Sequence, residues 1–265
     1  MFVCIIVRYI QNQNKKLYMH QYGILGYGFV GMATHKGLLN NCNIAVHDIK
    51  NKTEISALKD CDVIFCCLPT NDHRDVDILI DELKNLQSVN RSFLIVIRST
   101  VPVGTCARIE QELGTSILYI PEFLRERFWE TDCLKRPVIV GNDSAILPEF
   151  LDNMEIKVCS LNEAELVKMF SNNYATLRIA FANILFDLSQ KQNADYHLVK
   201  ELFFQTQHDQ TYMEVPGHDG KRGFGGKCLP KDLDFLIGTL DEYQIDSRLF
   251  RYIKENNEVW NGKEY

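Results

Sequence analysis

One cysteine near the end of the chain stands among residues that could make it a nucleophile. Cys228 follows a run of glycines and precedes Pro230, Lys231 and Asp232. Glycines let the backbone approach a bound ligand closely, and Pro230 favours the start of a helix, whose N-terminus stabilises a thiolate. This arrangement predicts a reactive thiol at Cys228. A glycine-rich turn with an inert cysteine is the ordinary interpretation of a lone thiol, but the surrounding residues argue against it here.

A second glycine-rich turn, near the start of the chain, predicts a dinucleotide site. Residues 26–31 have the G-x-G-x-x-G pattern between a short apolar strand and a helical stretch. In this turn the glycines allow a tight bend, the approach of a pyrophosphate and the packing of helix on strand. A carboxylate about 20 residues later binds a ribose 2′-OH and repels a 2′-phosphate, so Asp48 predicts NAD over NADP. The expected cofactor contacts are Gly26, Tyr27, Gly28, Phe29, Val30, Gly31 and Asp48.

Polar residues follow three further predicted strands. Thr70 and the loop 98–104 come after apolar runs, and the carboxyl ends of parallel strands meet in the ligand crevice of a doubly wound sheet. Thr70 is therefore expected to face the cofactor. Glu122 and Glu126 follow another strand at a spacing of four residues with Arg125 between them. That spacing also fits a solvated helix start, but the position after a strand favours a site.

A helical stretch later in the chain carries a lysine and an amide on one face. Lys168 and Asn172 are one turn apart, so their side chains can converge on one ligand oxygen. A lysine that extends its ammonium to water, beside an asparagine that acts like a helix cap, would give the same pattern. Both interpretations remain open from the spacing alone.

The elements that position these residues alternate between strand and helix up to residue 158. Apolar runs predict strands at 22–25, 43–47, 61–68, 93–97, 117–120, 137–141 and 156–158. Helical patterns separate them at 32–39, 72–90, 105–113 and 144–153. Such alternation predicts a Rossmann-like α/β domain with a doubly wound parallel sheet. The pattern then changes to long helices, predicted at 163–192, 198–205, 232–242 and 247–260.

These patterns divide the chain of 265 residues into three parts. Residues 1–18 form an N-terminal arm, 19–158 the NAD-binding Rossmann domain, and 159–265 an all-helical domain that carries the cysteine. We expect this helical domain to mediate dimerisation, because apolar residues on the last helix are predicted to be exposed: Leu249, Phe250, Ile253, Val259 and Trp260.

Composition excludes several classes of protein. There are 29 basic against 35 acidic residues, so the chain has no excess of positive charge that would bind nucleic acid or an anionic membrane. No apolar run reaches the length of a membrane span, and the first residues lack the features of a signal peptide. The nine cysteines are odd in number and form no C-x-x-C pair, which predicts a reduced cytoplasmic protein without a metal site.

In its ordered motifs the sequence resembles the UDP-glucose/GDP-mannose dehydrogenase family. The resemblance covers about residues 20–260. It rests on six blocks in the family's order: 26–31, 68–71, 98–104, 121–126, 168–173 and 223–232. Family members usually carry a third, C-terminal domain, and the chain is expected to lack it. Members also have a longer helical segment where this chain has residues 49–60.

This resemblance implies an NAD-dependent enzyme that oxidises the C6 alcohol of a nucleotide sugar to the uronate by two hydride transfers, with UDP-glucose as the expected substrate. Cys228 would form a thiohemiacetal and then a thioester, which water hydrolyses. Lys168 would stabilise the oxyanion with Asn172 beside it, and Asp232 would hold water and the lysine. Glu126 and Thr100 would position the hydrolytic water.

The remaining implied roles concern binding and proton transfer. Glu122 matches a candidate acid or base, and Lys231 matches a contact to NAD. Thr100 and Glu126 are expected near the cofactor as well. Residues that match the family's nucleotide-sugar lining are Phe123, Leu124, Arg125, Phe224 and Gly225, together with Glu122, Glu126, Lys168 and Asn172.

Two alternatives stay open. A 3-hydroxyacid dehydrogenase also joins a Rossmann domain to helices and uses a Lys-x-x-x-Asn pair, but it needs one hydride transfer and no cysteine. A truncated module could bind NAD and dimerise without turnover. In the preferred interpretation the partners are a nucleotide sugar and a second copy of the chain, with no nucleic acid and no membrane.

Overall fold

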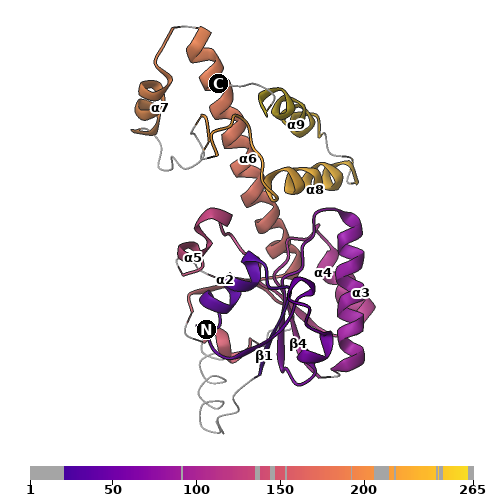
Figure 1. The fold of residues 1–265 in the computed structure, drawn as a ribbon. Helices are drawn as coiled ribbons and strands as arrows, with labels where there is room; N and C mark the ends of the chain where they lie inside the picture. The colour runs from indigo at the N-terminus through magenta and orange to yellow at the C-terminus, as the bar shows by residue number, and fades with distance from the viewer. Residues whose placement is uncertain are drawn as a thin grey trace, which may run out of the picture.

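The structure is a computed structural model that describes residues 21–261 apart from 91, 135–137, 144–146, 153, 192, 206–214, 218, 243, 245 and 246. The predicted arm at 1–18 lies outside the described residues. A seven-stranded sheet with helices on both faces forms one end of the molecule, and a group of helices forms the other (Figure 1). This arrangement confirms the predicted fold class.

The sheet has the strand order β2-β1-β3-β4-β5-β6-β7. Its strands are β1 (Tyr22–Leu25), β2 (Ile44–His47), β3 (Val63–Cys66), β4 (Leu94–Ile97), β5 (Ile117–Tyr119), β6 (Val138–Gly141) and β7 (Ile156–Cys159). The chain order reverses between β1 and β3, which places the crevice of a doubly wound sheet at the carboxyl ends of these two strands. The residues expected to bind the cofactor follow β1, β2 and β3.

The prediction of a wholly parallel sheet is wrong at one edge. β1 to β5 are parallel, but β6 pairs antiparallel with β5 through Tyr119 and Gly141, and β7 is parallel to β6. A parallel connection needs a long crossover, usually a helix. Between β5 and β6 the described chain forms only η3 (Glu126–Phe128) and the four-residue helix α5 (Trp129–Asp132). An apolar run is the same in either direction, so the pattern could not reveal the reversal.

Helices cover both faces of the sheet. α3 (His73–Val89) and α4 (Thr105–Leu113) pack on one face, and α2 (Phe29–Gly37) lies on the other (Figure 1). Alternate residues of β3 point to the two cores: Ile64 and Cys66 face α3 and α4, whereas Val63 and Phe65 face the opposite side.

The prediction of a helix at 144–153 is also wrong for the part of this range that the structure describes. That part contains only the single turn η4 (Glu149–Leu151), and Pro148 precedes it in an extended conformation. A proline inside a helix lacks the N–H that would donate to the preceding turn, and it disfavours a helical conformation in the residue before it. The spacing of the apolar residues around Pro148 is typical of a helix, but the proline prevents the backbone from forming one.

The helical part is organised around α6 (Leu161–Lys191), which begins on the sheet and extends away from it (Figure 1). At about 1.5 Å per residue its 31 residues span about 46 Å. Leu161 and Ala164 belong to the core of the sheet, whereas Ala180 belongs to a core with α8 (Leu229–Glu242) and α9 (Arg248–Asn261). The proposed domain boundary at 158 and 159 therefore falls just before a helix that is shared by both cores.

The remaining helix, α7 (Tyr196–Gln205), packs near the far end of α6 (Figure 1). Two of the apolar residues that were expected to be exposed on α9 are buried: Ile253 and Trp260 are each 5% exposed and pack against α8. Leu249 and Val259 are exposed as predicted. Among the described helices, none is both long enough and apolar enough to cross a bilayer.

Candidate active site

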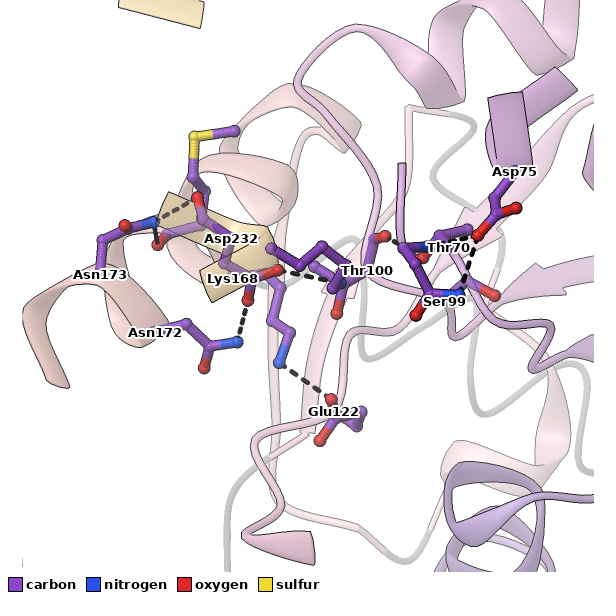
Figure 2. A network of polar contacts seen from close by, with 12 residues as sticks. Thr70, Asp75, Ser99, Thr100, Glu122, Lys168, Asn172, Asn173 and Asp232 are labelled. Carbon is purple, nitrogen blue, oxygen red and sulfur yellow. Dashed lines mark hydrogen bonds and ion pairs between the residues drawn. The ribbon is translucent and has the colours of Figure 1, made fainter. Parts of the chain in front are cut away.

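A buried ion pair joins the sheet to the helical part. Lys168 of α6 donates from Nζ to Glu122 Oε1 over 2.9 Å, and the two side chains are only 2% and 3% exposed (Figure 2). Glu122 follows β5, and its other oxygen accepts from Leu124 N at 2.6 Å. Lys168 therefore does not extend to water, which removes the alternative that its spacing had left open.

The pKa values of this pair keep both groups charged. Burial alone lowers the pKa of the Lys168 ammonium, but the carboxylates of Glu122 and Asp232 outweigh burial and raise it. Burial alone raises the pKa of Glu122, but Lys168 and the hydrogen bond from Leu124 outweigh it and lower the pKa. At neutral pH the site thus holds a fixed ammonium and a fixed carboxylate.

Asp232 joins α8 to α6 beside this pair. Asn172 donates from Nδ2 to Asp232 Oδ2, and Asn173 donates to the backbone carbonyl of Asp232 at 3.0 Å (Figure 2). Lys231 Nζ lies 2.9 Å from Asp232 Oδ1, and Asp232 is 1% exposed. The helix face that carries Lys168 and Asn172 is therefore turned toward the start of α8, where Cys228 stands.

The Cys228 thiol lies within reach of these charges. Burial raises its pKa most strongly, Lys168 and Lys231 lower it, and Glu122 and Asp232 raise it, with a net rise above the ordinary value. Cys228 directly precedes α8, and its carbonyl accepts from Asp232 N at 2.8 Å. The predicted nucleophile and Lys168 thus share one site. Burial and the two carboxylates therefore oppose formation of the thiolate, and the two lysines favour it.

The loops after β3 and β4 are bonded to one another on the Rossmann side. Thr70 Oγ1 donates to the carbonyl of Thr100 over 2.5 Å, and Ser99 Oγ donates to the carbonyl of Leu68 over 2.8 Å (Figure 2). Thr70 and Ser99 are buried. These bonds bring Thr70 and Thr100 together at the carboxyl end of the sheet, where both were expected.

The segment after β5 is held by two arginines. Arg98 is buried and donates to the carbonyl of Ile120 over 2.5 Å. Arg125 forms a bidentate ion pair with buried Asp132, with Nε 2.9 Å from Oδ2 and Nη2 2.8 Å from Oδ1. Arg125 therefore already has a carboxylate partner within the segment after β5.

The other expected lining residues differ in their surroundings. Lys168 Nζ lies 5.6 Å from the ring centre of Phe123, so Phe123 borders the site. Glu126 opens η3 and is exposed, and Gly225 is exposed before Cys228. The Phe224 ring is 3% exposed and packs in the core of α8 and α9. Ligand binding at Phe224 stays a prediction, and its ring faces the protein.

The first glycine-rich turn fits a dinucleotide. Gly26 has φ +89°, and a Cβ on Gly31 would lie 2.4 Å from the carbonyl oxygen of Gly26, so both positions require glycine. A Cβ on Gly28 would meet nothing within 4 Å. Gly28 is the N-cap of α2 and offers no side-chain acceptor to the first N–H groups of the helix. Those donors are available to a phosphate.

Asp48 lies beside this turn. Its Oδ2 accepts from Tyr27 N at 2.6 Å, and its Oδ1 accepts from Lys50 N at 2.8 Å. Burial alone raises its pKa, but the hydrogen bonds from Tyr27, Lys50 and Asn51 outweigh burial and lower it. The negative charge is thus fixed at the end of β2, and each carboxylate oxygen keeps acceptor capacity for a ribose hydroxyl.

Two buried residues in this region were missed by the sequence analysis. Glu165 is fully buried on α6 and accepts from Gly104 N and Cys106 N, each at 2.7 Å, at the start of α4. Asn257 of α9 is bonded to both backbone groups of Phe224. Only the position of Glu165 one turn before Lys168 could have pointed to the first, and nothing in the local sequence pointed to the second.

The fold and the site together define a Rossmann-type dinucleotide-binding protein whose second, helical part contributes a lysine, an amide and a thiol. Residues 36–154 match the NAD binding domain of the UDP-glucose/GDP-mannose dehydrogenase family, and residues 162–259 match the central domain of the same family. The chain belongs to the UDP-glucose/GDP-mannose dehydrogenase family. The match to the NAD binding domain also confirms NAD as the predicted cofactor.

Relatives agree with this assignment. The chain is 32% identical over 188 residues to a UDP-glucose 6-dehydrogenase of Campylobacter jejuni, covering 67% of this chain and 46% of that protein. It is 32% identical over 218 residues to one of Rickettsia conorii, covering 76% of this chain and 50% of that protein. The chain thus spans about half the length of these relatives.

Among solved structures, the fold is similar to a UDP-glucose dehydrogenase from Pyrobaculum islandicum, with a TM-score of 0.78 and 22% identity over 92% of this chain and 69% of that one. A UDP-D-ManNAc dehydrogenase from Pyrococcus horikoshii gives a TM-score of 0.74 at 19% identity over 90% of this chain and 68% of that one. At these identities the likeness supports the fold alone.

Proposed function

We propose that this chain carries out the NAD-dependent four-electron oxidation of a nucleotide sugar at C6, with UDP-glucose converted to UDP-glucuronate. The observation that carries the proposal is that the Cys228 thiol lies close enough to Lys168 and Asp232 for their charges to act on it, and that Lys168 is paired with Glu122 just after β5. The choice of UDP-glucose rests on the relatives that bear that name.

The chemistry explains why a thiol is needed. An aldehyde has no hydride on a tetrahedral carbon, so a nucleophile must add to it before a second oxidation. The Cys228 thiol would form the sulfur–carbon bond while its proton passes to the carbonyl oxygen, giving a thiohemiacetal. Oxidation gives a thioester, which water cleaves to the carboxylate and the free thiol. NAD, when bound, would take up the hydride in each oxidation.

The charged residues around Cys228 support these steps. Lys168 stays protonated and its charge acts on the thiol, so it would stabilise negative charge on the oxygen of each tetrahedral adduct. Glu122 stays ionised, so it holds the lysine and could accept a proton but is a poor acid. Glu126 is exposed and, with Thr100, is the proposed group that positions the hydrolytic water. Asn172 and Asp232 would orient Lys168 and the thiol.

Binding of NAD would use the first glycine-rich turn, with the pyrophosphate at the start of α2 and the ribose at Asp48. Lys231 and Thr70 are proposed as further contacts. The protein would act as a homodimer, since Val167, Phe170 and Tyr174 expose one apolar face of α6. Its free thiols suit the reducing cytoplasm.

The test is the ratio of NADH formed to sugar nucleotide consumed. Purified protein is mixed with NAD and a panel that includes UDP-glucose, GDP-mannose and UDP-N-acetyl sugars. We expect two NADH per UDP-glucose, and we expect Cys228→Ser to stop formation of the uronate while Cys159→Ser leaves it intact. One NADH per substrate would instead support the 3-hydroxyacid type of reaction. NAD binding without NADH from any sugar nucleotide would support a binding module.

A further inference from the structure

A buried asparagine of α9 is bonded to the loop that presents Cys228. Asn257 Oδ1 accepts from Phe224 N at 2.6 Å, and Asn257 Nδ2 donates to the carbonyl of Phe224 at 2.8 Å. The side-chain amide thus satisfies both backbone groups of one loop residue, as a neighbouring strand would. Asn257 is 8% exposed, so water cannot replace these bonds readily.

The loop is anchored at two points. At Phe224 the ring packs in the core with Leu233 and Trp260 while Asn257 holds the backbone. At the other end, the carbonyl of Cys228 accepts from Asp232 N in the first turn of α8. Between these anchors only residues 225–227 remain, and all three are exposed. The position of the thiol therefore depends on both anchors.

The residue before Phe224 fits only because it is a glycine. Gly223 has φ +80°, and a Cβ there would lie 2.5 Å from Asn257 Oδ1. Gly223 N also donates to Asn183 Oδ1 of α6 at 3.3 Å. The loop thus runs against α6 and α9 with no space for a side chain at this position. The close approach is what allows the asparagine to reach both groups of Phe224.

We propose that Asn257 is a positioning residue that fixes the loop 223–228 so that the Cys228 thiol stays beside Lys168 and partly shielded from water. The effect of Asn257 on the thiol follows from the contacts alone, whereas its effect on turnover rests on the proposed function. A change at Asn257 should therefore alter the reactivity of Cys228 even without substrate.

The expected direction follows from the surroundings of the thiol. Burial holds the pKa of Cys228 above its ordinary value and limits access to it. If the anchor at Phe224 is lost, the loop gains freedom and the thiol spends more time in water. Its thiolate then becomes more abundant near neutral pH, and reagents reach it more easily. Reactivity toward an external reagent should rise while turnover falls.

The experiment measures alkylation of the full chain by iodoacetamide from pH 7 to 10, with each cysteine followed separately by peptide mass spectrometry. Asn257→Leu removes both bonds, and Asn257→Asp keeps only the acceptor. Gly223→Ala pushes the loop away from an intact Asn257. We expect several-fold faster alkylation of Cys228 at pH 7.5 in Asn257→Leu and Gly223→Ala, with a smaller rise in Asn257→Asp.

Two matched controls distinguish this effect from a loss of packing that is not specific to the loop 223–228. Asn256→Leu changes the neighbouring asparagine, whose amide bonds to the carbonyl of Tyr252 within α9. Gly220→Ala changes a glycine with φ +77° at which a Cβ meets nothing within 4 Å, so it adds backbone strain without the clash. Both should leave the alkylation of Cys228 unchanged.

The buried thiols of Cys66 and Cys106 report unfolding in the same samples, because they react only when the sheet opens. Faster reaction at Cys228 without faster reaction at these two supports the proposal. An unchanged profile of Cys228 in folded Asn257→Asp and Gly223→Ala would overturn it. Parallel acceleration at all cysteines would also overturn it, since Asn257 would then stabilise the fold in general. If the variants change the alkylation of Cys228 as expected but the wild-type protein shows no turnover, the proposed function is refuted and the role of Asn257 is not.

Discussion

The Lys168 ammonium lies 2.9 Å from Glu122 Oε1 at the junction of the sheet and the helical part, and water reaches neither group. Glu122 follows the fifth strand, whereas Lys168 lies in the second turn of α6. The pair is thus an electrostatic link between the two parts, and the proposed catalytic charge depends on it.

Removing one partner of this pair should be strongly destabilising. Lys168→Met and Glu122→Gln each leave a buried group without its partner, and we expect each to lower the free energy of unfolding by about 3–5 kcal/mol. The double variant should be less destabilised than the sum of the two. Urea unfolding followed by circular dichroism measures all three. The exposed pair of Lys84 and Glu112 serves as the control, and Lys84→Met should have little effect. Additive losses at 122 and 168 would show that the pair is not coupled.

The same two substitutions should move the pKa of Cys228 in opposite directions. Lys168 lowers this pKa and Glu122 raises it. Lys168→Met should therefore slow alkylation of Cys228 at pH 8.5, because less thiolate is present, and Glu122→Gln should speed it. The midpoint of the pH–rate curve gives the pKa in each folded variant, with Cys159 as the internal reference. If the pKa of Cys228 shifted in the same direction in both variants, its exposure to water and not the neighbouring charges would determine that pKa.

Local patterns were sufficient for most of the fold. The apolar runs predicted all seven strands, most clearly β3, β4 and β5, because strands buried on both faces are nearly continuous in apolar residues. Pro148 showed where the pattern fails, since apolar spacing alone does not report whether the backbone can be helical. The direction of β6 was also hidden, because it is set by the length of the connection and not by the strand.

The candidate site was predictable where a residue belongs to a motif and not where it depends on a distant partner. The motifs indicated Cys228, Lys168 and Asp48. They could not indicate that Glu122 would pair with Lys168, because 46 residues separate them in the chain. Glu165 and Asn257 are ordinary polar residues on amphipathic helices. Only the tertiary structure turns them inward to bond backbone groups of other segments.

Glu165 should give the protein a distinct pH dependence. Burial raises its pKa even though it accepts two backbone hydrogen bonds. An acid with a higher pKa in the folded state binds more protons folded than unfolded between the two values. Its contribution to stability is therefore complete below about pH 4.3 and is lost as the pH rises through the folded pKa. Glu165→Gln cannot ionise, so the stability of wild type relative to this variant should fall from pH 4 to 8.

Thermal unfolding of both proteins across this range measures the difference. Glu163→Gln is the matched control, since Glu163 lies on the same helix, is exposed and accepts from Ser160 at the helix start. Those hydrogen bonds lower the pKa of Glu163. The stability of wild type relative to Glu163→Gln should therefore change with pH in the opposite direction. A stability difference at Glu165 that grows in favour of wild type as the pH rises would contradict the assignment of a raised pKa.

The two glycines that flank the start of α2 should separate cofactor binding from folding. A methyl group on Gly28 would meet no protein atom, but it would enter the space in which the pyrophosphate is expected, so Gly28→Ala should fold normally and bind NAD at least about tenfold more weakly. A methyl group on Gly31 would strike the carbonyl of Gly26 at 2.4 Å, so Gly31→Ala should lower the melting temperature. Calorimetric titration with NAD, run beside thermal unfolding, tests both. Unchanged NAD affinity in folded Gly28→Ala would place the pyrophosphate elsewhere, because no other consequence of the added methyl group is expected at that position.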